Sequence, residues 1–248
     1  MNTVIYVAIA VVAAVVCGYF LYANFRMKRA RRKELEEFNS RYSGKPLGEN
    51  HQRAMVYGAV LARSRGESVL SMIPKERIET YREGMKKSRN IVDEQSAITA
   101  LNALLQLQNS INFDEFIRTH ETNKELNRIY ARLSRELDLP EEEVKQVRST
   151  YAWDISRAVN VAKWCFWIGY LTESQFYGCL DRCNEIVGRL GKDWTEYTCS
   201  FLLGRSIQGF KPEEVIPAAK DLLAAIRDGA EVKTDDPDLT VYRDIAFS

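Results

Sequence analysis

Apolar residues recur at intervals of three and four along most of the chain, and no convincing strand-like alternation interrupts them. Residues 93–109 place Ile98, Leu101, Leu104 and Leu105 on one helical face. Residues 123–138 repeat that spacing after a capping asparagine. Further helices are predicted over residues 51–66, 74–90, 113–120, 173–190 and 194–208, and from Pro212 to about Gly229. The pattern therefore predicts an all-α fold.

The stretch from Pro140 to about Tyr170 is predicted as one long helix that is apolar on nearly every side after Tyr151. A helix of this kind is usually buried at the centre of a domain. Charged residues such as Asp154 and Lys163 are spaced through it, which argues against a membrane span. We expect this helix to form the centre of the globular part.

Residues 3–25 contain no charged side chain. As a helix rising about 1.5 Å per residue they would cover about 34 Å, enough to cross a hydrocarbon core of about 30 Å. A cleaved signal peptide normally has basic residues before its apolar core, and here the amino terminus is the only positive charge in that position. A lipoprotein signal would need a small residue before Cys17, where Val16 stands. We therefore expect a retained transmembrane helix.

The charges near this segment predict its orientation. Of the 35 basic residues, six lie in residues 26–33, whereas all 34 acidic residues follow them. Basic residues beside a span stay on the cytoplasmic side, so we expect an external N-terminus and a cytoplasmic C-terminal domain at the inner membrane. The cluster is interpreted as a topology signal that faces anionic lipid and not as a nucleic-acid site. Its members are Arg26, Lys28, Arg29, Arg31, Arg32 and Lys33.

A break in the helical pattern at residues 43–46, which include Gly44 and Pro46, marks the best linker candidate. The chain is accordingly divided into a transmembrane anchor (1–25), a basic juxtamembrane segment with linker (26–50) and a multi-helix domain (51–248). The end of the tail, within residues 230–248, is expected to form either a short strand or an extended docking segment.

One part of the C-terminal half carries a recognisable set of motifs. Residues 152–157 read Ala-Trp-Asp-x-x-Arg, residues 169–171 read Gly-Tyr-Leu, and residues 203–205 read Leu-Gly-Arg after a tryptophan at 194. This arrangement resembles the bacterial family called domain of unknown function 1266, specifically over residues of about 150–210 and loosely upstream. The resemblance implies no activity. Its matching positions are Trp153, Asp154, Arg157, Gly169, Tyr170, Leu171, Trp194, Gly204 and Arg205.

The same region holds the candidate ligand or interface residues. Asp154 and Arg157 are three apart on one helix, so their side chains can meet. With neighbouring aromatic rings they could bind an anionic or planar ligand, because guanidinium groups pair with phosphate or carboxylate and stack on rings. The alternative is a structural ion pair that locks the central helix. The candidate set is Trp153, Asp154, Arg157, Asn160, Trp194 and Arg205.

Other chemistry has little support in the sequence. Cys179 and Cys183 are one turn apart, but a zinc site would need two more ligands, and the two histidines, His51 and His120, are isolated. No phosphate-binding glycine loop or nucleophile elbow occurs. We therefore predict no metal and no cofactor, and reduced cysteines.

These observations favour a membrane-tethered protein-interaction or regulatory module at the cytoplasmic membrane face, with an unknown protein partner. They lean against enzymatic activity but leave it open. The alternative is a small-ligand-binding protein or enzyme that uses the Asp/Arg/Trp cluster of the central helix. A pocket lined by the cluster would favour the alternative, whereas full burial as a closed network would favour the module.

Overall fold

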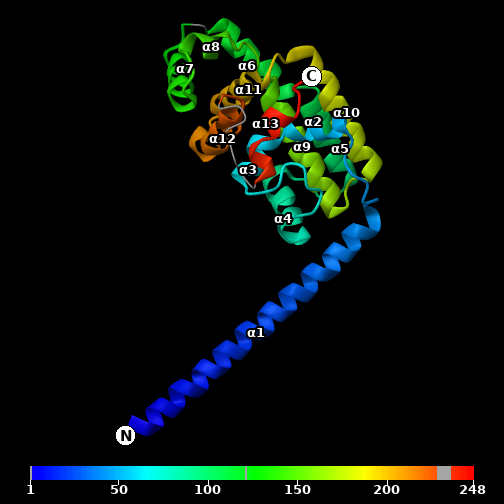
Figure 1. The fold of residues 1–248 in the computed structure, drawn as a ribbon, viewed down its shortest axis with the longest axis vertical. Helices are drawn as coiled ribbons and strands as arrows, with labels where there is room; N and C mark the ends of the chain where they lie inside the picture. The colour runs from blue at the N-terminus through cyan, green and yellow to red at the C-terminus, as the bar shows by residue number, and fades with distance from the viewer. Residues whose placement is uncertain (1, 121, 228–235) are drawn as a thin grey trace. The chain divides into compact units, whose positions relative to one another are not determined.

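The computed structural model describes residues 2–120, 122–227 and 236–248 (Figure 1). Within these ranges the regular structure is entirely helical, with no strand, which confirms the predicted all-α class and multi-helix domain. The chain divides after Gly44 into two units, residues 1–44 and 45–248. Each unit is described by itself.

The first unit is built on one helix, α1 (Asn2–Arg41), which is 40 residues long. It includes all six residues of the basic cluster, and large apolar side chains such as Tyr19, Leu21 and Phe25 are exposed on it. Across the described residues, no helix has both the length and the apolar character that crossing a membrane requires. The transmembrane anchor is therefore not supported by this result and stays a prediction.

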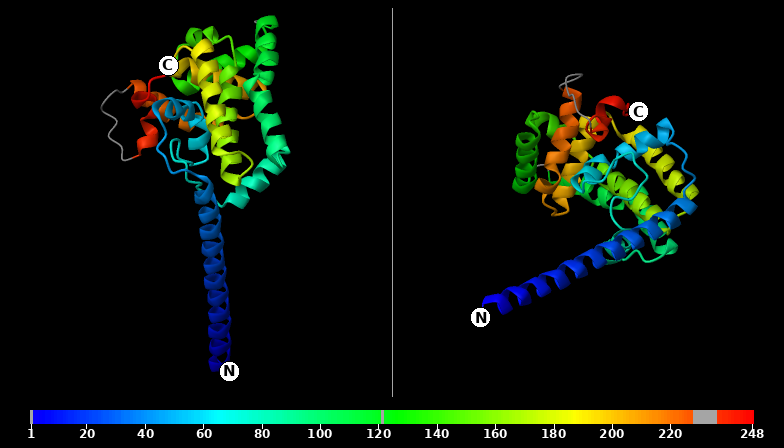
Figure 2. Two further views of the ribbon diagram at one scale, coloured as in Figure 1. Left: turned by 90° about the vertical axis from the view of Figure 1, so that its right-hand side faces the viewer. Right: turned by 60° about the horizontal axis from the view of Figure 1, so that its bottom comes forward.

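The second unit packs its helices around α9 (Tyr151–Ile168), whose 18 residues are all buried. Helices α4, α5, α10 and α11 lie against it (Figures 1 and 2). The helices besides α9 are α2 (Glu49–Val56), α3 (Ala59–Ser64), α4 (Ile78–Arg89), α5 (Glu94–Leu105), α6 (Gln108–Thr119), α7 (Lys124–Leu137), α8 (Glu141–Gln146), α10 (Glu173–Leu190), α11 (Trp194–Ile207), α12 (Ile216–Arg227) and α13 (Val241–Asp244). Short 3-10 turns are formed by Pro212–Glu214 and Pro237–Leu239.

The single helix predicted from Pro140 to about Tyr170 is wrong, because α8 ends at Gln146 and α9 begins only at Tyr151. A side chain from α6 explains the break. Asp114 accepts hydrogen bonds from the Thr150 backbone N–H (2.7 Å) and hydroxyl (2.9 Å), and from the Ser149 hydroxyl (2.6 Å). A carboxylate that accepts hydrogen bonds at this position stabilises the start of a new helix. The apolar periodicity of residues 140–170 does not reveal this contact, because Asp114 lies outside that segment.

Elsewhere the local signals match the helix ends. Thr172 and Gln175 form a reciprocal capping box at the start of α10, as their spacing predicts. Asn123 and Asp193 cap α7 and α11 with their side chains. Gly169 ends α9 with a φ of 85°, a left-handed conformation that glycine adopts without a steric penalty. Helix boundaries were therefore predictable where capping residues are close in sequence.

The C-terminal segment docks on the domain through Trp194. The indole ring stacks on Tyr242 with centroids 4.5 Å apart, and its Nε1–H donates to the Ile245 carbonyl at 3.0 Å. The Tyr57 hydroxyl also donates to the Phe247 carbonyl at 3.1 Å. Residues 241–244 form helix α13 instead of the short strand considered above, while residues 230–235 lie outside the described part.

Helices α9 and α11 approach closely at Gly204. A Cβ atom at this position would lie 2.5 Å from the Trp153 Cβ and 3.0 Å from the Thr150 Cβ. Both atoms are next to the backbone and have little freedom to move away. Only glycine, which has no Cβ, fits at this helix crossing. This steric requirement explains the middle residue of the Leu-Gly-Arg motif.

We predict that Gly204→Ala destabilises the protein by about 1–3 kcal/mol, the usual cost of overpacking a core. Denaturant unfolding measures this change. The matched control is Gly188→Ala on the exposed side of α10, where an added Cβ meets nothing within 4 Å. That variant should be stabilised by roughly 0.5–1 kcal/mol, because alanine favours the helix. Equal stabilities of the two variants would contradict the steric explanation.

Candidate functional site

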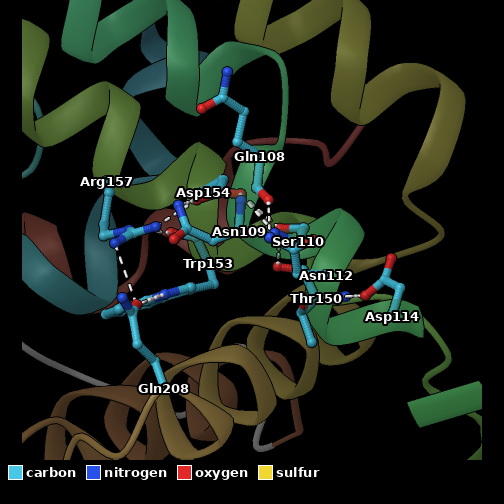
Figure 3. Close-up of polar contacts among 10 residues, drawn as sticks. All are labelled: Gln108, Asn109, Ser110, Asn112, Asp114, Thr150, Trp153, Asp154, Arg157 and Gln208. Carbon is cyan, nitrogen blue, oxygen red and sulfur yellow. Dashed lines mark hydrogen bonds and ion pairs between the residues drawn. The ribbon is translucent and has the colours of Figure 1, made fainter. Parts of the chain in front are cut away.

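Asp154 lies at the centre of the candidate site and is fully buried (Figure 3). Its Oδ2 accepts from the backbone N–H groups of Asn109 (3.1 Å) and Ser110 (2.9 Å), and its Oδ1 accepts from the Asn109 side-chain amide (2.9 Å). These donors belong to the first turn of α6, which has no side-chain cap of its own. Asp154 therefore supplies, from α9, the negative charge that a helix N-terminus favours.

Arg157 joins this carboxylate to the end of α11. It forms an ion pair with Asp154, donates from Nε to the Trp153 carbonyl (3.2 Å) and donates from Nη1 to Gln208 Oε1 (3.3 Å). Its guanidinium carbon lies 4.3 Å from the centroid of the Trp153 ring. The Trp153 indole N–H donates to the same Gln208 oxygen at 2.6 Å (Figure 3). The four side chains form a closed network.

The other predicted site residues lie in separate surroundings. Arg205 pairs with Glu214 and donates to the Lys211 carbonyl (3.0 Å), and its guanidinium lies 6.0 Å from the Trp153 ring. Asn160 donates to the carbonyls of Gly58 (3.0 Å) and Ser156 (2.8 Å).

Trp194 holds the C-terminal segment, as described above. The structure thus brings together Trp153, Asp154 and Arg157, with Arg205 beside the tryptophan. Asn160 and Trp194 take part in other contacts. Gln208, Asn109 and Ser110 were not predicted, because Gln208 follows the end of α11, the other two lie in the first turn of α6, and none carries a pattern of its own.

The electrostatics of the network follow from its burial. Burial lowers the pKa of Arg157, and the Asp154 carboxylate opposes that change. Arg89, on α4, is half-buried nearby, and its pKa falls to about 10 because of burial and then the charges of Arg157 and Arg65. Every nitrogen of the Arg157 guanidinium already has an acceptor. The geometry of Asp154 and Arg157 therefore suits a structural lock between α6, α9 and α11.

Lys163 is a second buried charge on α9, with 2% of its surface exposed. Its ammonium group donates to the carbonyls of Ser68 (2.7 Å) and Val69 (3.3 Å). Burial lowers its pKa from 10.5 to about 8, against the opposing charges of Glu67 and Asp238. The lysine ties the segment between α3 and α4 to the central helix.

All five cysteines are free, and four of them are buried. Burial raises the pKa of Cys165 and of Cys199 to about 12, which keeps these thiols protonated at neutral pH. Among the residues that the structure describes, no three His, Cys, Asp or Glu side chains are grouped to hold a metal ion.

A groove of about 320 Å³ opens between α6, α7 and α11. Its lining is largely apolar, and Phe113, Phe116 and Ile129 are only half-buried there. Ile129 belongs to the apolar stripe of α7, whose other members are buried in the core. Half-buried aromatic and aliphatic side chains in a groove are typical of sites that receive an apolar partner. Its lining residues are Phe113, Phe116, Glu125, Leu126, Ile129, Ser206 and Ile207.

Comparison with known proteins gives one match. Residues 84–228 match the model of a family described as "Protein of unknown function (DUF1266)". The matched range includes α5 to α12 and extends further upstream than the motifs alone indicated. No curated protein matches the chain, and no solved structure matches it.

We predict that Asp154→Ala destabilises the protein by about 3–5 kcal/mol, because it leaves Arg157 as a buried charge without its partner. It also removes the acceptor of the first α6 amides. Denaturant unfolding measures the change. Glu115→Ala removes one partner of the exposed Glu115–Arg118 pair and should cost at most about 1 kcal/mol. A small effect of Asp154→Ala would contradict its role as a lock.

The low pKa of Lys163 predicts a specific pH dependence of stability. Because the folded-state pKa of about 8 lies below the ordinary 10.5, the protonated lysine lowers stability below pH 8. This penalty is relieved as the pH rises from 8 towards 10.5. From pH 7 to pH 9 the free energy of unfolding should therefore rise by about 1 kcal/mol relative to Lys163→Met.

The measurement compares chemical denaturation of the two proteins at each pH, which cancels the titration of groups that they share. Lys86→Met, at an exposed lysine of α4, serves as the control and should show no such difference from the parent. If the free energy of unfolding changed with pH in the same way for the parent and for Lys163→Met, Lys163 would not be the titrating group.

Proposed function

Because the chain belongs to the DUF1266 family of proteins of unknown function, we propose its role from its own geometry: a membrane-tethered module that binds a protein partner. The helical domain binds the partner through the groove between α6, α7 and α11. Helix α1 holds the domain at the cytoplasmic face of the inner membrane, with the N-terminus outside.

The groove is the observation that carries the proposal. It presents Phe113, Phe116 and Ile129 in a concave apolar surface on three helices. An amphipathic helix of a partner fits such a surface through side chains spaced three and four residues apart. Covering these rings removes apolar surface from water, at about 25 cal/mol for each Å² buried.

The tether is supported by the sequence of α1. Residues 3–25 have no charge, and the six basic residues from Arg26 to Lys33 follow directly. Exposed Tyr19, Tyr22 and Phe25 precede the basic cluster, in the order that membrane interfaces favour. Anionic headgroups would attract each basic residue near the surface by about 1 kcal/mol.

The alternative function, ligand binding or catalysis by the Asp/Arg/Trp cluster, has weaker support. Asp154 has no exposed surface, and its oxygen atoms are occupied by α6 and Arg157. A ligand would have to displace hydrogen bonds that stabilise the central helix. The geometry favours the interaction module for this reason.

The test is crosslinking of the full-length protein in cells, followed by isolation of carbonate-washed membranes. We expect the protein to remain in the washed membranes, together with a specific crosslinked partner. Ile129→Glu places a charge in the groove and should reduce the yield of that partner on the order of tenfold. The control is Ile73→Glu, the same substitution at an isoleucine that is 63% exposed before α4.

Both variants are first shown to be helical and to unfold cooperatively. Release of the parent protein by carbonate would contradict the tether. An equal partner yield from Ile129→Glu and Ile73→Glu would contradict the assignment of the groove. The two parts of the proposal therefore fail separately.

A further inference from the structure

The C-terminal segment, residues 241–248, covers a surface built from aromatic side chains of the helical domain. In Figure 2 this segment lies on the outside of that domain. We propose that the surface is a binding site for an extended peptide that carries a phenylalanine, and that the chain's own C-terminal segment fills this site as an autoinhibitory strap. The site is separate from the groove between α6, α7 and α11 and does not depend on the function assigned to that groove.

The site contains an aromatic pocket, which Phe247 fills with only 9% of its surface exposed. The Phe247 ring meets the Trp194 ring edge to face, with centroids 4.9 Å apart and planes at 89°. The rings of Tyr57 (6.0 Å) and Tyr197 (6.1 Å) form two further walls. Gly191 lies against the same ring, because a Cβ there would be 2.6 Å from the Phe247 Cζ. Edge-to-face contacts of this kind favour an aromatic side chain as the occupant.

Two donors of the domain recognise the main chain of the segment. The Trp194 indole N–H donates to the Ile245 carbonyl at 3.0 Å, and the Tyr57 hydroxyl donates to the Phe247 carbonyl at 3.1 Å. Ile245 has extended backbone angles, with φ −116° and ψ 117°. Both donating residues are buried, and a buried donor that lacks an acceptor costs free energy. Whatever covers these donors must therefore offer acceptors at this spacing, as an extended peptide does.

Tyr242 adds a second aromatic contact on the same tryptophan. Its ring stacks on the Trp194 ring with centroids 4.5 Å apart and planes at 9°. Its hydroxyl lies 3.2 Å from the Thr198 hydroxyl. Trp194 thus contacts both aromatic side chains of the segment and one of its carbonyls, which makes it the central residue of the site.

The segment is attached to the domain in the manner of a ligand. Its own backbone hydrogen bonds are local, since the Ile245 N–H donates to the Val241 carbonyl and the Asp244 N–H donates to the Thr240 carbonyl. Arg243 and Asp244 are exposed and pair with each other. Side chains of the domain supply the hydrogen bonds that hold residues 245–247. The segment can therefore leave the pocket without breaking a helix of the domain.

The preceding residues keep the strap close to its site. Asp236 pairs with Arg63 at 3.1 Å, and Asp238 accepts from the Val69 backbone N–H at 3.0 Å. A strap held in this way is present at a high effective concentration, so it outcompetes a free peptide of the same affinity. A peptide added in trans is expected to bind well only when the strap is weakened.

The test is fluorescence polarisation with a labelled synthetic peptide of residues 239–248, added to the full-length protein. We expect full-length Phe247→Ala to bind this peptide about tenfold or more tightly than the parent, whose own strap fills the site. The matched control is full-length Ala246→Gln at the exposed neighbouring position, which should bind the peptide as weakly as the parent. A peptide that itself carries Phe247→Ala should lose about tenfold or more in affinity for the Phe247→Ala protein, because its anchor side chain is missing.

Equal affinity of the peptide for the parent and for Phe247→Ala would overturn the strap. Equal affinity of the two peptides for the Phe247→Ala protein would overturn the aromatic pocket. Absence of peptide binding by a Phe247→Ala protein with the helix content of the parent, measured by circular dichroism, would also overturn the proposal. Full-length Phe247→Leu keeps most of the apolar volume and gives a milder weakening of the strap, so the test remains decisive if Phe247→Ala does not fold.

Discussion

The fold depends on one constraint: the central helix α9 is wholly buried but carries polar and charged side chains, and burying such groups without hydrogen bonds is costly. Three of these side chains meet the need with backbone groups of different neighbours. Asp154 accepts the first amides of α6, Asn160 donates to Gly58 between α2 and α3, and Lys163 donates to the segment before α4. The polar groups of α9 therefore determine where the surrounding elements begin and end.

The motifs that carry the resemblance to the family find a physical explanation in this arrangement. Trp153 and Arg157 share Gln208 at the end of α11, while Gly204 allows α11 to approach Trp153. Gly169 ends α9 in a conformation that suits glycine. These residues describe how α9 and α11 cross and where α9 stops. Packing and hydrogen bonding account for their positions.

The sequence was informative where the physical cause is local. Capping by Thr172 or Asn123 and the apolar period of α7 act within a few residues, so these helices could be predicted closely. The break before Tyr151 was missed because its cause, Asp114, is more than 30 residues away.

The candidate site shows the same limit. Asp154 and Arg157 could be paired from their spacing, and the structure brings them together. Gln208 reaches the same part of α9 only through tertiary packing, so helical periodicity could not identify it. Asn160 shares a helix face with Trp153 and Arg157, but its amide is taken up by the Gly58 carbonyl. A common helix face is therefore not sufficient for a common site.

The buried network and the groove are mechanically connected. Phe113 and Phe116 line the groove from α6, and Ile207 lines it from the end of α11. The start of α6 is held by Asp154, and the residue after Ile207 is held by Trp153 and Arg157. Two walls of the groove are thus positioned by side chains of α9 that do not contact it. For the partner binding that we propose, such a groove keeps its shape, because the entropy of ordering its walls is lost during folding and not again on binding.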